Sequence, residues 1–527
     1  MAWYTETNDD WIRRNKTKTV QVGSWVGRDK PVAVGTALVM LPISLTDRPD
    51  LINVRNLDLA PLPMLARMMR YGTAIDLDYL SGLSEELGDT KSDLEKEIRK
   101  HVPASRFAEW KGKAEVKEDD EGDDESAGVE NSESLSFNVN SPEQVAWFLF
   151  DTLGLGEGQN LKRTPDGKRI STGKKQLEVL KGEHEVVKLL LDFREAAKLK
   201  STYCDALPHK AVLHPKGRCP YCSIPGDDRT HRESHYRIHT TFTSTRAATG
   251  RLASKAPNLQ NIPKRSKIGK RIRAAFIPQP GMKWVSADFS QIELRILAHY
   301  SNDPYMRHIY GIGGDIHSMT AMRAFGISEQ EFKSYDSAAL KEFEDYKRLP
   351  CKNVNFGIVY GLTAKGLQAQ LTLSGIYWSE EECQLFIDRW FAVFTGVRPY
   401  MQQQEYRVLT YGFNWDIWGR VRWYPGIHSV HRRIVAEALR EAGNTPIQGS
   451  SAGLTKYTMA LAEQRDRTMY DTEGALFNPL LTIHDEVIYE AEESIAEDLL
   501  ALNLSLMSSA IELRVPVLAD GKVKDRW

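Results

Sequence analysis

The sequence has few cysteines and no apolar run long enough to cross a membrane. Five cysteines in 527 residues cannot form a disulfide framework, so we expect the reducing environment of the cytosol. Residues 31–45 form the most apolar stretch, which is too short for a transmembrane helix. The N-terminal residues MAWYTETNDD contain no apolar run, which excludes a signal or transit peptide. These absences predict a cytoplasmic protein without a membrane partner.

The sequence also lacks a strong net charge, since its formal charge is only −2. Opposite charges are nevertheless separated along the chain. Residues 118–125 read EDDEGDDE, whereas residues 255–273 carry seven Lys and Arg and no acid. A basic stretch of this kind can neutralise the phosphates of a nucleic acid, although a solvated basic loop would have the same composition. Charge alone leaves both interpretations open.

Helical and strand patterns divide the chain, and no internal repeat is evident. Apolar residues recur at helical spacing in 58–101 and 175–207. Residues 112–136 are acidic and poor in apolar side chains, which predicts disorder. Strand patterns at 283–288 and 478–490 enclose a mainly helical region. This order predicts an α+β sheet domain that carries a helical insertion.

Two groups of acids stand where buried strands are expected to end. Asp288 leaves the strand KWVSAD and precedes a helix, so it could hold a cation or simply cap the helix. His484, Asp485 and Glu486 interrupt an otherwise apolar hairpin. Acids in such a place cost stability unless they are paired or bound to a metal. The second group is therefore the stronger indication of a metal site.

A helical pattern between these groups combines cations with aromatic rings. Arg348, Lys352, Phe356 and Tyr360 follow one another at intervals of four residues and so share one helix face. A core stripe would not contain the two cations, and a solvated face would not contain the two rings. The pattern fits a nucleotide whose triphosphate meets the cations and whose base and sugar meet the rings.

These patterns resemble, in the same order, the motifs of family A DNA polymerases. DFSQIELR (288–295), R-x-x-x-K-x-x-x-F-x-x-x-Y-G (348–361) and HDE (484–486) are similar to motifs A, B and C of that family. Further segments also match it: 130–203, 245–263, 446–453 and 514–527. The resemblance extends from residue 58 to the C-terminus and is to the polymerase part of bacterial DNA polymerase I.

The resemblance implies an α+β, right-hand polymerase fold with an antiparallel-sheet palm, helical fingers and a helical thumb. The expected parts are an N-terminal segment of unknown role (1–57), a thumb (58–240) with an acidic insertion (112–136) and a Cys/His insertion (209–239), a first palm segment (241–310), fingers (311–440) and a second palm segment (441–527). Only 57 residues precede the thumb, too few for the exonuclease domain of most relatives, so we expect no proofreading in this chain.

The resemblance assigns catalytic and metal-binding roles. Asp288 and Asp485 would hold two Mg²⁺ ions, with the backbone carbonyl of Phe289 as a further ligand. Glu486 would be an auxiliary acid near the metals. Lys352 would contact the triphosphate and protonate the leaving group. The implied activity is template-directed addition of deoxynucleoside triphosphates to a primer 3′ end, in DNA replication or repair.

The resemblance also assigns contacts to the incoming nucleotide. Arg348 and His317 would clamp its outer phosphates, and Phe356 would stack against it. Glu293 and Tyr360 would close the space beside C2′ of the sugar, where a ribose hydroxyl would clash or remain unpaired. These residues predict selection of deoxynucleotides.

Primer–template DNA is the expected macromolecular partner. The residues expected to contact it are Arg251, Asn258, Gln260, Asn261, Arg440, Gln448 and His484. Arg251, Arg440 and Gln448 match family positions on the minor-groove side of the primer end. The acceptors in that groove are shared by all correct base pairs, so donors there can check pair geometry without recognising sequence.

The Cys/His insertion carries a spacing that is compatible with zinc. Cys219, Cys222, His231 and His235 form C-x2-C-x8-H-x3-H, a plausible set of four ligands for a structural Zn²⁺ ion. Two free thiols in a loop rich in basic residues are the alternative. The sequence leaves both open.

Two other functions share parts of this pattern. A single-subunit RNA polymerase has the palm aspartates and the Lys…Tyr-Gly helix. Glu293 argues against this function, because it would exclude the ribose 2′-hydroxyl. A non-catalytic DNA-binding protein with a polymerase fold would be free to lose an acid, yet Asp288, Asp485 and Glu486 are all present.

The acidic insertion and the expected lack of nuclease domains suggest a biological setting. A polyanion within the thumb would be repelled by DNA, so the insertion should point away and could recruit a replication partner. A polymerase without nuclease domains would suit a bacteriophage and viral DNA replication, so the expected location is the bacterial cytosol or that of a phage-infected host cell.

Overall fold

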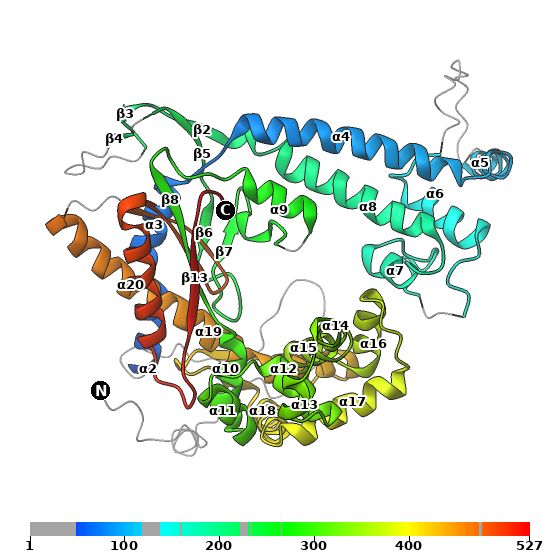
Figure 1. Cartoon of the computed structure of the whole chain (residues 1–527). Coiled ribbons are helices and arrows are strands. Elements are labelled where there is room, and N and C mark those ends of the chain that lie inside the picture. The colour runs from blue at the N-terminus through cyan, green and yellow to red at the C-terminus, as the bar shows by residue number, and fades with distance from the viewer. Residues whose placement is uncertain are drawn as a thin grey trace, which may run out of the picture.

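The computed structural model describes residues 49–118, 137–158, 161–221, 230–231, 233–264, 266–473 and 477–527. Its helices and strands form three parts (Figure 1). A sheet-based part lies on one side, a pair of long helices extends across the top, and a group of helices lies below the far end of that pair. The α+β architecture predicted from the sequence, with palm, thumb and fingers, is confirmed.

The palm is built on a four-stranded antiparallel sheet. Its strands lie in the order β11–β12–β8–β13. Their bounds are Phe477–Ile483, Glu486–Glu492, Met282–Phe289 and Ala519–Lys524. β11 and β12 form the apolar hairpin expected from the sequence, and every residue of both strands except the last of β12 is buried. The hairpin and β8 therefore bring their acids to the same end of the sheet.

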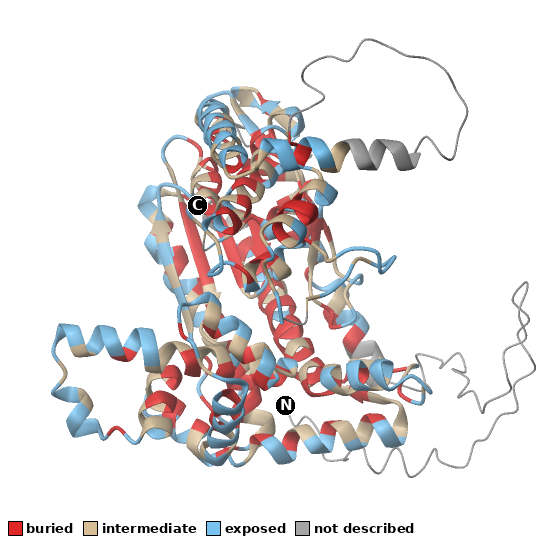
Figure 2. Ribbon diagram, turned by 90° about the vertical axis from the view of Figure 1, so that its right-hand side faces the viewer, coloured by how far each residue is buried: buried red, intermediate tan, exposed pale blue. Residues whose placement is uncertain are grey.

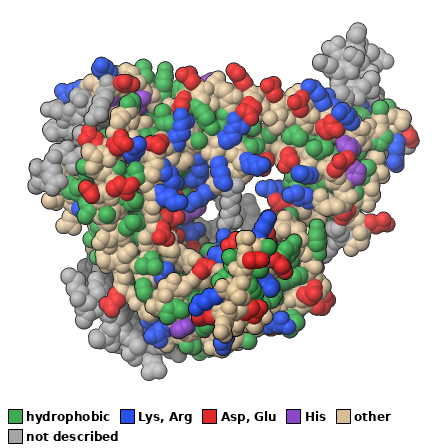
Figure 3. Space-filling model, viewed as in Figure 1, with side chains coloured by type: hydrophobic (Ala, Val, Ile, Leu, Met, Phe, Trp, Pro, Cys, Tyr) green, Lys and Arg blue, Asp and Glu red, His purple; other side chains and the backbone are tan. Residues whose placement is uncertain are grey.

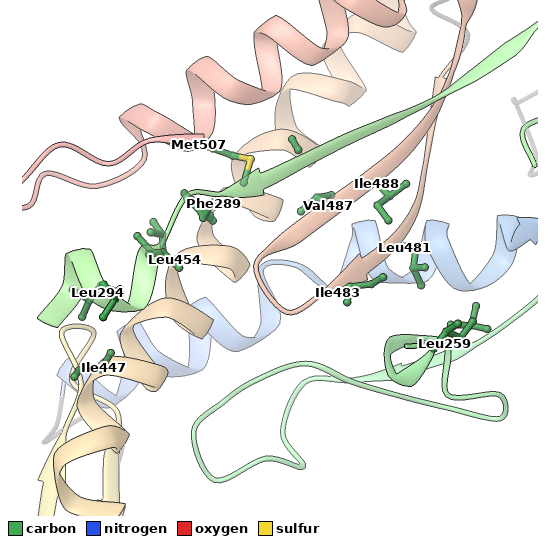
Figure 4. Packing of buried hydrophobic residues seen from close by; sticks show 14 of the residues in the cluster. Leu259, Phe289, Leu294, Ile447, Leu454, Leu481, Ile483, Val487, Ile488 and Met507 are labelled. Atoms are coloured by element: carbon green, nitrogen blue, oxygen red, sulfur yellow. The ribbon is translucent and has the colours of Figure 1, made fainter. Parts of the chain in front are cut away.

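Helices cover the palm sheet and enclose its apolar core. α20 (Ala496–Ser509) packs on β8 and β13. Buried side chains from β8, from α10 (Ile292–Ser301) and from α19 (Arg432–Glu473) meet beside the strand ends, and Phe289 lies next to Leu454 there (Figure 4). Burial of apolar area is worth about 25 cal/mol per Å². This core therefore holds the end of β8 firmly against the helices around it.

The thumb consists of a pair of long helices with a core of its own. α4 (Leu77–Lys100) and α8 (Glu185–Leu199) pack along each other (Figure 1). Asp76 caps α4 by accepting a hydrogen bond from a backbone N–H of its first turn. A separate apolar cluster that includes Phe107 and Phe148 lies at the far end of the pair. The smaller helices of the thumb are α5 (Ala104–Glu118), α6 (Pro142–Ala146), α7 (Lys174–Val179) and α9 (Lys267–Ala274).

The first described helices cross the expected thumb boundary at residue 58. α2 (Pro49–Leu59) and α3 (Leu62–Tyr71) lie against α19, and α3 also packs on β11. Asp58 accepts hydrogen bonds from Arg420 at 2.6 and 2.8 Å and from the buried Lys456 at 2.7 Å. This partly buried ion network joins α2 to the palm side, so the helical thumb begins only at α4.

The fingers are almost entirely helical. They comprise α11 (Pro304–Gly311), α12 (Ile316–Phe325), α13 (Glu329–Lys333), α14 (Ser337–Glu342), α15 (Leu349–Gly357), α16 (Ala364–Leu373), α17 (Glu380–Val393) and α18 (Val397–Tyr411), with a hairpin of β9 (Phe413–Trp415) and β10 (Val421–Trp423). The expected boundary between residues 440 and 441 falls inside α19. This helix of 42 residues is therefore shared by fingers and palm.

Short strands join the thumb to the palm. One small sheet has the order β1 (Thr73–Ala74), β5 (His235–Ile238), β2 (Ala211–His214), and two hairpins pair β3 (Gly217–Arg218) with β4 (Thr230–His231) and β6 (Thr241–Thr243) with β7 (Ala253–Lys255). β2, β3, β4 and β5 all belong to the region 209–239 predicted as a Cys/His insertion.

The distribution of buried residues matches the division into three parts. Buried residues concentrate in the palm sheet and on the inward faces of the helices, whereas outward helix faces are exposed (Figure 2). No helix in the described ranges is both long and apolar enough to cross a bilayer. Most of the predicted acidic insertion, residues 119–136, lies outside the described residues.

Candidate active site

Carboxylates from three neighbouring strands meet at one end of the palm sheet. Asp288 on β8 pairs with Glu486, the first residue of β12, and on its other side with Asp520 of β13. Glu486 is buried and accepts a hydrogen bond from the Ser286 hydroxyl. The antiparallel register therefore concentrates negative charge where β8 ends.

Asp485 occupies the tight turn between β11 and β12. His484, which precedes it, has the left-handed φ of 54° that this turn requires. The Oδ1 atom of Asp485 accepts hydrogen bonds from Ser451 Oγ at 2.6 Å and Thr455 Oγ1 at 3.4 Å, both on α19. The N–H of Phe289 donates to the Asp485 carbonyl at 3.3 Å. The turn is thereby fixed beside the end of β8.

The ammonium of Lys264 lies near two of these acids. The pKa of Asp288 is raised to about 7, chiefly by burial and also by repulsion from Glu486. The ammonium of Lys264 partly offsets this, since its Nζ lies 3.8 Å from Asp288 Oδ2 and 3.9 Å from Glu486 Oε2. Lys264 belongs to the basic stretch of the sequence, but no motif singled it out. A group of acids with one exposed counter-ion favours a divalent cation.

The donor atoms of this group suit magnesium. Carboxylate oxygens are hard ligands of the kind that Mg²⁺ prefers. Asp288 and Glu486 supply such oxygens from paired positions of β8 and β12, and Asp485 supplies them from the adjoining turn.

The predicted nucleotide-binding face lies on a helical segment of the fingers. Arg348 ends a π-helical stretch (Phe343–Arg348), α15 follows it, and a 3₁₀ turn ends at Tyr360. The rings of Phe356 and Tyr360 belong to residues that are 36% and 44% exposed. Aromatic rings left open beside one another on a helix indicate a binding surface.

Arg348 is oriented by Asp315, which caps α12, and by Ser318 in its first turn. Its Nε donates to Asp315 Oδ2 and to Ser318 Oγ, both at 3.0 Å. These bonds engage one edge of the guanidinium and leave the terminal nitrogens to meet an anion. Hydrogen bonds from Ser318 and Arg348 hold the pKa of Asp315 at about 2 despite its burial, so this acid stays charged. The sequence did not identify Asp315 or Ser318.

The hydrogen bonds around His317 fix its tautomer. Trp390 Nε1 donates to Asn355 Oδ1 at 2.6 Å, so the amide nitrogen of Asn355 is the atom that faces His317 Nδ1 at 2.9 Å. His317 Nδ1 is therefore an acceptor, and its Nε2 carries the proton in the neutral ring. Burial lowers the pKa of His317 to about 4. The ring centroid lies 5.3 Å from that of Phe356, which places a neutral N–H donor beside the aromatic face.

A hydrogen bond joins the fingers to the palm. The Tyr360 hydroxyl donates to Glu293 Oε2 at 2.5 Å, and Arg251 Nη2 lies 2.5 Å from Glu293 Oε1. Burial raises the pKa of Glu293, and the positive charge of Arg251 opposes this shift. The side chain of Gln448 is hydrogen-bonded to the Tyr360 hydroxyl. Glu293 lies in the first turn of α10, directly after the strand that carries Asp288. The structure therefore brings four separately predicted residues into one cluster.

The other predicted DNA contacts differ in their surroundings. Arg440 is exposed on α19 and packs its side chain against Gly361. Asn258 and Asn261 are exposed. Gln260 differs from the expectation, because it is buried and its amide donates to the Thr482 carbonyl at 2.9 Å and accepts from the Ser254 N–H at 3.1 Å. Its amide therefore supports β11 instead of facing a ligand.

Basic side chains gather around a central opening of the molecule (Figure 3). Part of this group lies over α9, where Lys267 and Lys270 are exposed. Arg271 and Arg273 of the same helix have protein partners, Glu86 and the Ile262 carbonyl. The lysines are therefore the members of the basic stretch on α9 that can meet phosphates.

The predicted zinc ligands are only partly brought together. Cys219 and His231 lie in one buried cluster, but its third member is His214 rather than His235. His235 is excluded by its own contacts: its Nδ1 donates to the Glu233 carbonyl at 3.0 Å, and its Nε2 accepts from Arg237 at 3.0 Å. Cys222 lies outside the described residues.

Comparison with known proteins gives a consistent result. The sequence model described as DNA polymerase family A matches residues 113–527. DNA polymerase I of Deinococcus radiodurans is 33% identical over 464 residues, which cover 88% of this chain and 41% of that protein. Thermostable DNA polymerase I of Thermus filiformis is 38% identical over 396 residues, 74% of this chain and 42% of that protein. The chain thus spans about two fifths of the length of these relatives.

A solved structure matches as well. It is the POL domain of Pol1 from M. smegmatis in complex with DNA primer-template and dNTP, and it is similar to this chain with a TM-score of 0.69 at 31% identity. The match covers 89% of this chain and 70% of that chain. The likeness therefore includes nearly all of the palm, fingers and thumb.

Proposed function

Because the chain belongs to DNA polymerase family A, we propose that it adds deoxynucleoside 5′-triphosphates to a primer 3′ end as a DNA template directs, releasing pyrophosphate. The observation that carries the proposal is the 2.5 Å hydrogen bond between Tyr360 and Glu293. It joins the aromatic and cationic face of the fingers to the helix that follows the Asp288 strand. A nucleotide held on that face would therefore lie next to the palm acids.

The palm acids supply the metal-binding part of this proposal. Asp288 and Asp485 would hold two Mg²⁺ ions, with the Phe289 carbonyl as a further ligand and Glu486 as an auxiliary acid. When bound, such ions lower the pKa of the primer 3′-hydroxyl and stabilise charge on the triphosphate and the leaving pyrophosphate. Ser451 and Thr455 position Asp485 for this role through their bonds to Oδ1.

The fingers residues would bind the triphosphate. Arg348, held by Asp315 and Ser318, presents its terminal nitrogens to the outer phosphates. The Nε2–H of neutral His317 adds a hydrogen bond without a charge. Lys352 contributes a full positive charge and would donate a proton to the leaving group.

The remaining residues would select the sugar and hold the DNA. Phe356 stacks against the incoming nucleotide, while Glu293 and Tyr360 close the space beside C2′. Arg251, Arg440 and Gln448 are proposed to reach the minor-groove side of the primer end. The exposed lysines of α9 would neutralise backbone phosphates.

Replacing Lys352 by Ala should lower kcat/KM for a deoxynucleotide by about 10–100-fold. A hydrogen bond to a charged group is worth about 1.5–3 kcal/mol, and the lysine ammonium would make such a bond to the triphosphate. Single-nucleotide incorporation kinetics measure the effect. Lys365→Ala, which removes an exposed lysine at the start of α16, is the matched control and should leave the kinetics unchanged. Equal effects of the two variants would remove Lys352 from the site.

The apparent affinity for Mg²⁺ should weaken as the pH falls through about 7. The pKa of Asp288 is raised, so its proton competes with the metal below that pH and is absent well above it. Below that pH, the apparent Mg²⁺ affinity should fall by about tenfold for each further decrease of one pH unit. Mg²⁺ titrations of primer extension from pH 5.5 to 9 measure it. Asp520→Asn removes a charge that raises this pKa and should move the profile to lower pH. A profile with no inflection would contradict the assignment.

Primer extension with Mg²⁺ tests the proposed function as a whole. A DNA primer–template is incubated with deoxynucleotides or with ribonucleotides, and the product sequence is compared with the template. Template-directed extension with deoxynucleotides supports the proposal. Comparable use of ribonucleotides would indicate an RNA polymerase, and tight DNA binding without extension would indicate a non-catalytic protein.

A further inference from the structure

Three buried side chains with metal-binding atoms meet beside the small sheet that joins thumb and palm. The Cys219 sulfur and one ring nitrogen each of His214 and His231 all lie within 4.8 Å of one another. Cys219 Sγ is 3.3 Å from His214 Nδ1. The three residues are 0%, 0% and 5% exposed. A buried thiol and two buried imidazoles in such proximity form the kind of donor set that zinc prefers.

A chain of hydrogen bonds fixes the tautomer of His214. His239 Nδ1 donates to the Met69 carbonyl at 2.8 Å, so the Nε2 of a neutral His239 is an acceptor. His214 Nε2 lies 3.0 Å from that acceptor and therefore carries the proton. His214 Nδ1 is left with a lone pair on the side of the Cys219 thiol.

The same reasoning applies to His231. The Gln279 amide nitrogen donates to Glu490 Oε1 at 2.8 Å and also to the Tyr71 hydroxyl, so Gln279 Oε1 is the atom that faces His231 Nδ1 at 2.8 Å. His231 Nδ1 is therefore the donor, and Nε2 holds a lone pair. That Nε2 is buried and has no hydrogen-bond partner within the described part of the chain.

An ordinary packing role explains only part of this geometry. A thiol that donates to His214 Nδ1 would account for the Cys219–His214 contact. It would leave the lone pair of His231 Nε2 buried and unsatisfied, which is unfavourable. A cation placed among the three atoms satisfies all of them at once. In addition, each histidine donates its other ring nitrogen to a further residue, as metal-bound histidines commonly do.

We propose that His214 Nδ1, Cys219 Sγ and His231 Nε2 bind a structural Zn²⁺ ion. The thiol releases its proton on binding, while both imidazoles bind in the neutral tautomers that their hydrogen bonds already set. The mixed sulfur and nitrogen donors favour zinc over Mg²⁺, which prefers oxygen. This ion is distinct from the metals of the palm acids.

The ion would tie the insertion to the palm. Through His239 the cluster reaches Met69 of α3, and through Gln279 it reaches Glu490 of β12. β12 also carries Glu486, four residues before Glu490. Loss of the ion should therefore lower the unfolding temperature and leave the rate of nucleotide addition at low temperature largely unchanged.

Metal analysis of the whole chain tests the proposal. The protein is washed with chelator, loaded with Zn²⁺ and dialysed against metal-free buffer, and zinc is measured by mass spectrometry. We expect about one zinc per chain in the wild type and in His235→Gln, the matched control outside the cluster. His214→Ala and Cys219→Ser should each lose at least about 90% of the zinc, because each removes a ligand.

Absence of zinc from the wild type, retention in both cluster variants, or equal loss in the control would overturn the proposal. If a variant fails to fold, the wild type alone decides the matter with Co²⁺ in place of Zn²⁺. A thiolate ligand gives a sulfur-to-cobalt charge-transfer absorption, and wild-type protein without that absorption would contradict the site.

Discussion

Replacing Asp288 by Asn is expected to slow single-turnover nucleotide addition by at least about 1,000-fold, while DNA binding persists. In the proposed site this carboxylate anchors the ions that stabilise the charge of the transition state, a contribution of several kcal/mol, and each factor of ten corresponds to about 1.4 kcal/mol. The substitution keeps the shape of the side chain, so the sheet should not be disturbed. Rapid-quench measurements of one addition, together with a DNA-binding titration, separate the two effects.

Asp520 provides the matched control for this experiment. It pairs with Asp288 from the other neighbouring strand and contributes to the same negative charge, but it belongs to none of the motifs. Asp520→Asn should therefore change the rate only slightly at pH 8. Asp288→Asn with a near-normal rate would refute the two-metal assignment, as would an equally large effect of Asp520→Asn.

Replacing Glu293 by Ala is expected to raise the use of ribonucleotides relative to deoxynucleotides by about 100-fold. The side chain is held by Tyr360 and Arg251, so it forms a fixed wall rather than a flexible one. Removing it opens space beside C2′, and discrimination against an added hydroxyl is typically of this size. The measurement is the ratio of kcat/KM for a deoxynucleotide to that for its ribonucleotide on one primer–template.

Two further variants of this pair sharpen the test. Glu293→Gln keeps the volume and should preserve most of the discrimination. Tyr360→Phe keeps the ring but removes the hydroxyl that donates to Glu293, so it should give an intermediate ratio. A large wild-type ratio that Glu293→Ala leaves intact would remove this residue from sugar selection, although the polymerase function would remain.

The sequence predicted those parts of the site that local patterns encode. The apolar runs on either side of Asp485 specify a hairpin, and the structure forms β11 and β12 there. The four-residue spacing from Arg348 to Tyr360 specifies a shared helix face, and the segment is helical throughout, although it passes through π, α and 3₁₀ geometry. Both patterns are local, so neighbouring residues alone suffice to specify them.

Other features depend on contacts between distant segments. His214 lies at the end of β2, which pairs with β5, whereas Cys219 and His231 belong to the separate β3–β4 hairpin. The three residues meet only in the folded chain, and no spacing rule includes His214. Gln260 becomes a buried support only because Thr482, 222 positions later, presents a carbonyl to it.

The position of α2 also depends on contacts with distant segments. Asp58 pairs with Arg420 and Lys456, which lie 362 and 398 positions later in the chain. Such pairings reflect the packing of whole elements, which a single sequence does not reveal.

Incorporation of a single nucleotide opposite each of the four template bases tests the central claim most directly. The chain is mixed with primer–template, Mg²⁺ and one deoxynucleotide at a time, and extension and pyrophosphate release are followed together. The account predicts rapid addition of only the complementary nucleotide, with one pyrophosphate for each addition. Folded protein that binds the primer–template but adds no nucleotide, or that adds all four alike, would contradict it.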